Sequence, residues 1–243
     1  MHTSLSPGLV RAGAPASARI VIRTVRSGAE LVGAKAPVRL DADVYLVHDG
    51  AAPFVSTCEP HTEPLVVELL VPRALAGSAF LPALRSIDGP VGRRLGELAQ
   101  RRTGEPRISL SGSDAAAWWS LLEQEELALR ARAARIRCVK AATRDALFRR
   151  LLLSADFIQS HYEEPLNVEL LAAVSNLSPF HFARLFALVM DETPHAFLVR
   201  KRVTVARRLL ASGLGRGDVA ERAGFGCRST LFRHLRGAAA VPS

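Results

Sequence analysis

Short apolar runs rich in β-branched residues fill the first third of the chain, with Gly, Pro and Asp between them. The clearest runs lie at 19–25, 42–48 and 65–71. Runs of this length, bounded by turn-forming residues, predict antiparallel β-strands. Three to five strands fit between residues 19 and 80, which is few for a closed barrel. We therefore expect an incomplete β domain at the front of the chain.

From residue 89 the apolar spacing becomes helical, and residues 89–102 predict one helix. A longer helix starts near Ser113-Asp114, which suit an N-cap, and runs toward residue 139. Its narrow apolar stripe consists of Trp119, Leu122, Leu129, Ala133 and Ile136. Such a stripe either packs on the chain's own β domain or forms a dimer contact, and periodicity does not separate the two. A further helix is expected at 144–161.

A short helix, a tight turn and a second helix then occur twice, at about 166–190 and 216–237. Asn176 takes the turn in the first copy, and Gly224 takes it in the second, where the backbone needs a residue that tolerates positive φ. Ser178 suits the N-cap of the next helix and Pro179 its first position. This order of elements is typical of a helix-turn-helix unit, whose second helix lies in a DNA major groove.

A helix from Pro194, capped by Thr193, to about Ala211 connects the two copies, and Gly213 ends it. Eighteen residues at about 1.5 Å each give a rod of about 27 Å. One turn of DNA measures about 34 Å. The rod is therefore long enough to hold two recognition helices near successive major grooves.

The outer faces of the two recognition helices carry the residues expected to contact DNA. In the first copy these are Ser178, Pro179, Phe180, Ala183 and Arg184. In the second copy they are Arg228, Ser229, Thr230, Phe232 and Arg233. The candidates for phosphate contact on the connecting helix are Lys201, Arg202, Arg207 and Arg208. An arginine on such a face either reads guanine or binds only phosphate, and both interpretations stay open here.

Charge favours an anionic partner, because the chain of 243 residues has a formal net charge of +9. Between Pro194 and Arg236, ten basic residues stand against two acidic ones, a net charge of +8. Three scattered cysteines offer neither a disulfide framework nor a zinc spacing. The first residues lack a signal peptide's apolar core, and no window is apolar enough to span a membrane. We expect a cytoplasmic, bacterial protein without membrane contact.

At these residues the chain resembles the AraC/XylS family of bacterial transcription regulators. The matching pattern includes Ser178-Pro179-Phe180-His181-Phe182, Thr193-Pro194, Arg202-Val203 and Val219-Ala220 before Gly224-Phe225. The resemblance covers about residues 145–243. It implies two three-helix subdomains joined by a linker helix, double-stranded DNA as the partner, and contact with RNA polymerase. The small Ala183 stands where the family often has a polar residue, so readout by the first helix would rest on Arg184.

The β-rich front half is similar, more faintly, to the cupin-like sensing domains of that family, which bind small effectors or dimerise. The expected fold is α+β with two domains. Residues 1–140 form a partial cupin-like antiparallel β domain with helices. Residues 141–243 form an all-α domain of two helix-turn-helix subdomains joined by a linker helix. A small-molecule effector at the N-terminal domain and a homodimer through the 114–139 helix are the further partners considered.

No catalytic or cofactor site is expected. The segment 59–63, with His48 and Cys58 nearby, has only one histidine within it and two flanking prolines, so it indicates a surface loop rather than a metal site. The leading hypothesis is a sequence-specific transcription regulator that is not an enzyme. A cupin-type small-molecule binding protein or enzyme with a helical appendage is the alternative. A third interpretation is a DNA-binding remnant, because the chain stops at Ser243, where the family continues into a last short helix.

Overall fold

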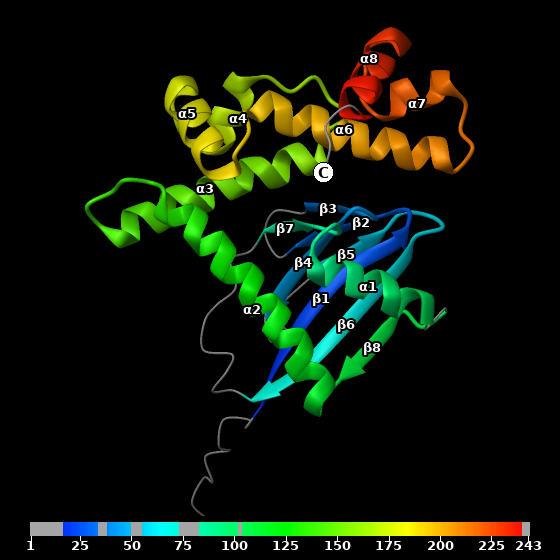
Figure 1. Ribbon diagram of the computed structural model, residues 1–243, viewed down its shortest axis with the longest axis vertical. Helices are drawn as coiled ribbons and strands as arrows, with labels where there is room; N and C mark the ends of the chain where they lie inside the picture. Colours follow the sequence, from blue (N-terminus) through cyan, green and yellow to red (C-terminus); the bar gives the residue numbers. More distant parts are fainter. Residues whose placement is uncertain (1–16, 34–37, 50–54, 73–82, 102–103, 240–243) are drawn as a thin grey trace, which may run out of the picture.

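The computed structural model describes residues 17–33, 38–49, 55–72, 83–101 and 104–239, and Figure 1 shows its β-rich and helical halves. One sheet has five strands in the order β7-β4-β1-β6-β8, and the other has three in the order β3-β2-β5. The strands are β1 (Ser17–Ser27), β2 (Ala29–Gly33), β3 (Val38–Asp41), β4 (Val44–Asp49), β5 (Val55–Cys58), β6 (Glu63–Pro72), β7 (Leu84–Ser86) and β8 (Arg107–Leu110).

Among the described residues, two helices accompany the sheets and six form the C-terminal half. They are α1 (Pro90–Arg101), α2 (Gly112–Ala134), α3 (Ala141–Ser160), α4 (Val168–Val174), α5 (Pro179–Met190), α6 (Pro194–Ala211), α7 (Arg216–Arg222) and α8 (Arg228–Ala239). The prediction of a β-rich front half followed by a helical half is confirmed. α2 begins two residues earlier than expected, behind Ser111, and ends at Ala134 rather than near 139.

The three predicted strands are β1, β4 and β6, which lie side by side at the centre of the larger sheet. Ile22 on β1 stands opposite Val47 on β4 and Val67 on β6, and all three side chains are buried. The expected number of strands was wrong, because the described residues between 17 and 72 already form six. The missed ones are short and lack a continuous apolar run. The pairing is antiparallel except between β6 and β8, which run parallel.

The apolar stripe of α2 is buried within the chain. Trp119 and Leu122 pack with α1 on the face of the larger sheet, in one cluster with Ile22 and Val67. Further along the chain, Leu129 and Ala133 of α2 and Ile136 just after it join the core of the helical half. Of the two interpretations of this stripe, the structure shows the one in which it packs within its own chain. A homodimer through the 114–139 helix stays a prediction.

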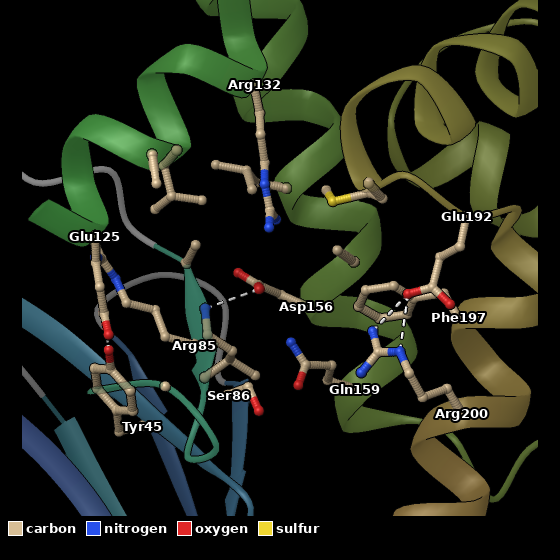
Figure 2. A pocket seen from close by; sticks show the side chains of 18 residues that line it. Tyr45, Arg85, Ser86, Glu125, Arg132, Asp156, Gln159, Glu192, Phe197 and Arg200 are labelled. Atoms are coloured by element: carbon tan, nitrogen blue, oxygen red, sulfur yellow. Dashed lines mark hydrogen bonds and ion pairs between the residues drawn. The ribbon is translucent and has the colours of Figure 1, made fainter. Parts of the chain in front are cut away.

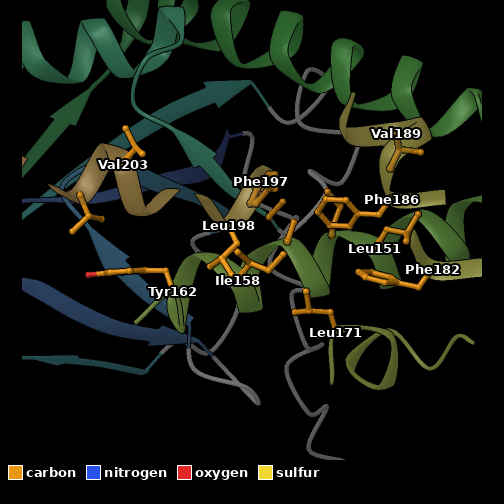
Figure 3. Packing of buried hydrophobic residues seen from close by; sticks show 14 of the residues in the cluster. Leu151, Ile158, Tyr162, Leu171, Phe182, Phe186, Val189, Phe197, Leu198 and Val203 are labelled. Atoms are coloured by element: carbon orange, nitrogen blue, oxygen red, sulfur yellow. The ribbon is translucent and has the colours of Figure 1, made fainter. Parts of the chain in front are cut away.

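The core of the helical half lies between α3, the two helix-turn-helix units and α6 (Figure 3). Phe186 lies with its ring centre 5.4 Å from that of Phe182 and 5.5 Å from that of Phe197, so three aromatic rings from α5 and α6 join. Leu151 and Ile158 of α3 are fully buried against them. Burial of such side chains stabilises a fold by about 1.5–3 kcal/mol each.

The two halves touch through specific polar bonds as well as apolar contacts. The backbone N–H of Leu84 donates to Asp156 Oδ1 at 2.9 Å, which joins β7 to α3. The N–H of Arg39 donates to Ser160 Oγ at 3.1 Å, which joins β3 to the same helix. None of the helices in the described part of the chain combines the length and apolar character that crossing a bilayer requires.

Candidate nucleic-acid interface

The first helix-turn-helix unit consists of α4, a tight turn and α5. Asn167 caps α4 by accepting a hydrogen bond from Leu170 N at 2.8 Å. Asn176 forms the turn with φ of 49°. Its N–H donates to Ala173 O, and that of Leu177 donates to Ala172 O, both at 2.9 Å. This pair of bonds is a Schellman closure, which fixes the direction in which α5 leaves the turn.

The second unit, α7 to α8, closes in the same way. Gly224 has φ of 74°, its N–H donates to Glu221 O at 2.9 Å, and that of Phe225 donates to Ala220 O at 2.8 Å. The doubled pattern in the sequence therefore becomes two turns with the same hydrogen bonds. A side chain at Gly224 would collide, since an added Cβ would stand 2.5 Å from Tyr162 O. Glycine is required here both for its φ and for this close approach.

α5 has one buried and one open face. Its inward residues are Phe182, Leu185, Phe186 and Val189, and all four are buried as predicted. Ser178 caps the helix by accepting from His181 N at 3.4 Å, ahead of Pro179. Phe180 is 82% exposed, and Arg184 is also exposed, while Ala183 between them is half-buried. The expected outer face of α5 is therefore exposed, apart from Ala183.

α8 presents Arg228, Ser229 and Arg233 to solvent, whereas Thr230 and Phe232 are half-buried. The Arg216 guanidinium lies over the ring of Phe232, 5.2 Å from its centre. A cation stacked on the ring shields part of it, so Phe232 is only partly available for a DNA contact. Leu231, in contrast, is fully buried and anchors the helix.

Cys227 occupies the position before α8 that Ser178 occupies before α5, and sequence reasoning did not single it out. Its Sγ lies 3.1 Å from Ser229 Oγ and 3.2 Å from Thr230 Oγ1. These hydrogen bonds, that of Ser229 first, lower the pKa of the exposed Cys227 thiol to about 7. The register of the two units was the signal that could have found it.

α6 joins the two units, with α4 and α5 at one end and α7 and α8 at the other (Figure 1). Thr193 caps it by accepting from Ala196 N at 3.2 Å, and the helix spans Pro194–Ala211 as predicted. Arg202, in the middle of the helix, donates from Nε to Tyr162 O at 2.6 Å and from Nη2 to Glu164 O at 2.7 Å. Burial lowers the pKa of Arg202.

The structure contradicts the assignment of Lys201 as a phosphate contact. Its side chain is 4% exposed, and Nζ lies 2.9 Å from Asp43 Oδ2 and 3.3 Å from Asp41 Oδ2. The amphipathic pattern of α6 could not show this, because both carboxylates come from the distant β3–β4 corner. Of the other candidates, Arg202 is engaged with carbonyls and Arg208 shares Asp43 at 3.3 Å. Arg207 is exposed.

A groove beside α5 adds basic residues that the sequence did not point to. It measures about 720 Å³ and lies between the end of α2, the start of α3 and α5. Arg184 lines it together with Arg135, Arg137 and His181. Arg135 is paired with Asp191, at 2.5 Å, whereas Arg137 is exposed. Arg137 therefore lines the same groove as Arg184, the predicted base-reading residue of the first unit.

The segment considered as a metal site forms the turn between β5 and β6. His61 has φ of 62°, and Cys58 is exposed. Within the described ranges, no three His, Cys, Asp or Glu side chains gather as a metal site requires.

Residues 171–242 match a family model described as a helix-turn-helix domain. This half carries an AraC-type helix-turn-helix domain. A relative from Photobacterium leiognathi, "Probable transcriptional regulator LumQ", is 32% identical over 91 residues. The match covers 36% of this chain, and this chain spans only 37% of that protein's length.

Two solved structures are also similar to this chain. The DNA-binding domain of AdpA, a global transcriptional factor, solved with a target DNA, is 32% identical and covers 37% of this chain and 82% of its own, with a TM-score of 0.36. ToxT from Vibrio cholerae O395 is 10% identical and covers 89% of this chain and 84% of its own, with a TM-score of 0.37. Both TM-scores lie below 0.5, so these likenesses add nothing to the sequence match. The assignment of a helix-turn-helix domain of the AraC type therefore rests on the sequence match of residues 171–242.

Proposed function

We propose that this chain is a sequence-specific DNA-binding transcription regulator that reads two successive major grooves with α5 and α8. The proposal rests on one observation: two helix-turn-helix units with the same turn geometry lie at the two ends of α6. Each copy leaves the outer face of its second helix exposed, with Arg184 on α5 and Arg228 and Arg233 on α8. Arginine on a recognition helix can bind guanine O6 and N7 in a bidentate fashion.

Phosphate contacts would come from both ends of this surface. Arg207 on α6 is exposed, and Arg137 lines the groove beside Arg184. Each phosphate that such a residue neutralises releases counterions, which makes binding steeply dependent on salt. Ser178 and Pro179 at the start of α5 belong to the same proposed contact surface, as do Phe180, Ser229 and Thr230.

The remaining parts of the proposal follow from this role. The boundary between a sensing domain of residues 1–140 and a DNA-binding domain of residues 141–243 falls between α2 and α3. A regulator acts on the chromosome, so we place the protein in the cytoplasm and assign it no enzymatic activity. The alternative of a cupin-type binding protein with a helical appendage is not favoured, because it leaves two equivalent DNA-reading units without a use.

Selection of genomic DNA fragments by the purified full chain tests the proposal. We expect a small set of fragments that share one asymmetric motif. The variants Arg184→Ala and Arg233→Ala should each weaken binding to that motif by about 1–3 kcal/mol and relax the preference at different bases. Arg101→Ala, an exposed arginine at the end of α1, is the matched control and should bind as the parent does. Fragments without a shared motif would overturn the proposal.

A further inference from the structure

A cavity of about 420 Å³ opens between the two halves of the chain (Figure 2). β7 and α2 form its walls on one side. α3, the end of α5 and the start of α6 form them on the other. Small-molecule sites in proteins typically measure about 300–1,000 Å³ and combine apolar walls with a few placed polar groups. This cavity has both.

Asp156 points from α3 into the cavity (Figure 2). The residue is 7% exposed, and no ion pair reaches its carboxyl within the described residues; Oδ1 accepts only the N–H of Leu84 at 2.9 Å. Burial raises the pKa of Asp156 to about 8, and the Leu84 hydrogen bond lowers it only in part. A buried carboxyl without a counter-ion is costly when it ionises, and a cation placed beside it would remove that cost.

Arg132 points toward Asp156 from α2, on the opposite wall (Figure 2). Its side chain is exposed, and it forms no ion pair in the part of the chain that the structure describes. The other charged residues of the walls are already paired. Arg200 binds Glu192 at 2.7 Å, and Arg85 binds Glu126, just outside the cavity, at 2.9 Å.

The Glu125 carboxylate is also engaged, since it accepts a hydrogen bond from Tyr45 Oη. Asp156 and Arg132 therefore face the cavity from opposite sides, and neither forms an ion pair within the described residues. The lining also has an apolar part. It is formed by Leu129, Leu152, Ala155, Met190 and Phe197.

We propose that this cavity binds a small zwitterion of the amino-acid type, with its ammonium group on Asp156, its carboxylate on Arg132 and its apolar side chain against Leu152 and Phe197. Arginine is the side chain best suited to hold a carboxylate, through two parallel N–H donors. An aspartate in a low-dielectric site selects a cation by charge and hydrogen bonding together. A ligand with only one of the two groups leaves the other residue without a partner.

The site is distinct from the DNA-reading surface but shares elements with it. Met190 is the last residue of α5, and Phe197 belongs to α6. A ligand held between α2 and these helices would favour one arrangement of the halves, and linkage then requires that it change DNA affinity. This role as an effector site rests on the proposed function, whereas ligand binding itself does not.

Calorimetry on the full chain tests the site with matched probes. The zwitterions are L-phenylalanine, L-leucine and L-methionine; the single-group probes are 2-phenylethylamine and 3-phenylpropanoate. We expect at least one zwitterion to bind, and L-phenylalanine to bind at least tenfold more tightly than either of its single-group analogues. If no zwitterion binds, or if 3-phenylpropanoate binds as tightly as L-phenylalanine, the proposal is wrong.

Two variants separate the two charges. Asp156→Asn keeps an acceptor for Leu84 N and should reduce L-phenylalanine to the affinity of 3-phenylpropanoate. Arg132→Gln should reduce it to that of 2-phenylethylamine. Asp145→Asn, an exposed position on α3, and Arg101→Gln are the controls and should leave binding unchanged. Unchanged affinity in Asp156→Asn or Arg132→Gln would refute the assignment.

DNA binding is measured separately with the selected fragments. A bound amino acid that leaves DNA affinity unaltered would overturn the effector role alone. Failure to select any DNA motif would overturn the proposed function while leaving the ligand site intact.

Discussion

Lys201 Nζ lies 2.9 Å from Asp43 Oδ2, so the helix that joins the two DNA-reading units is bound to a corner of the β-rich half. Asp41 Oδ2 lies 3.3 Å from the same nitrogen, and the side chains of Lys201 and Asp41 are only 4% and 2% exposed. Removing one partner of a buried ion pair costs about 3–5 kcal/mol, because the other charge stays buried.

We therefore predict that Lys201→Ala lowers the free energy of unfolding by about 3 kcal/mol, the lower end of that range. Arg39 remains beside Asp41 and Arg208 beside Asp43, which limits the loss. Urea unfolding measures it. Arg207→Ala, on the exposed side of the same helix, should keep its stability and lose part of the salt dependence of DNA binding. If Lys201→Ala instead kept its stability and lost part of the salt dependence of DNA binding, Lys201 would be a phosphate contact.

Gly224, in the turn of the second unit, and Gly213, just after α6, form a matched pair for testing the close contact at Gly224. Both have positive φ, 74° and 85°, but an added Cβ meets Tyr162 O at 2.5 Å only at Gly224. Gly213→Ala should cost about 1 kcal/mol, the strain of a left-handed residue. Gly224→Ala should cost clearly more, and α8 should lose protection in hydrogen exchange. Equal losses in the two variants would show that the contact with Tyr162 is not important.

The Cys227 thiol should react as an acidified cysteine. Its pKa of about 7 predicts that alkylation by iodoacetamide reaches half its maximal rate near pH 7, whereas an ordinary cysteine does so near pH 8.5. Ser229→Ala removes the first of the hydrogen bonds that lower this pKa, so the midpoint should move upward. Bound DNA should slow the reaction, since Cys227 directly precedes α8. A midpoint that Ser229→Ala leaves in place would contradict this account.

Asp156 makes stability depend on pH. Its folded pKa of about 8 lies above the unfolded value of about 4, so the stability it supports is complete below pH 4 and is lost as the pH rises to about 8. Asp156→Asn does not ionise. The parent should therefore lose stability relative to this variant by roughly 1 kcal/mol per pH unit within that window. Urea unfolding at pH 5, 6.5 and 8 measures the difference in free energy of unfolding between the parent and Asp156→Asn. A difference that does not change with pH would contradict the raised pKa of Asp156.

The local features of the helical half could be predicted from sequence because each depends on neighbouring residues. Ser178 and Thr193 cap their helices, and Asn176 and Gly224 take positive φ, as their residue types indicate. The buried face of α5 followed from its spacing. Which of the exposed arginines read bases and which bind phosphate stays a prediction.

Features that depend on distant contacts could not be predicted in this way. Lys201 is buried because two carboxylates 158 and 160 residues away meet it. The cavity needs β7, a strand of three residues with no apolar run of its own, to bring Leu84 beside Asp156. The spacing of the α2 stripe is compatible with packing against a second chain, and only the structure shows that the stripe packs against the cores of its own chain.

The central claim is that one chain reads two successive major grooves. Hydroxyl-radical footprinting of the full chain on its selected fragment tests it most directly, at a protein concentration where the complex has a one-to-one stoichiometry. We predict two protected segments centred about one helical turn, or 10 base pairs, apart. Arg184→Ala should weaken one segment, and Arg233→Ala should weaken the other. A single protected segment, or two that appear only when a second chain binds, would contradict the claim.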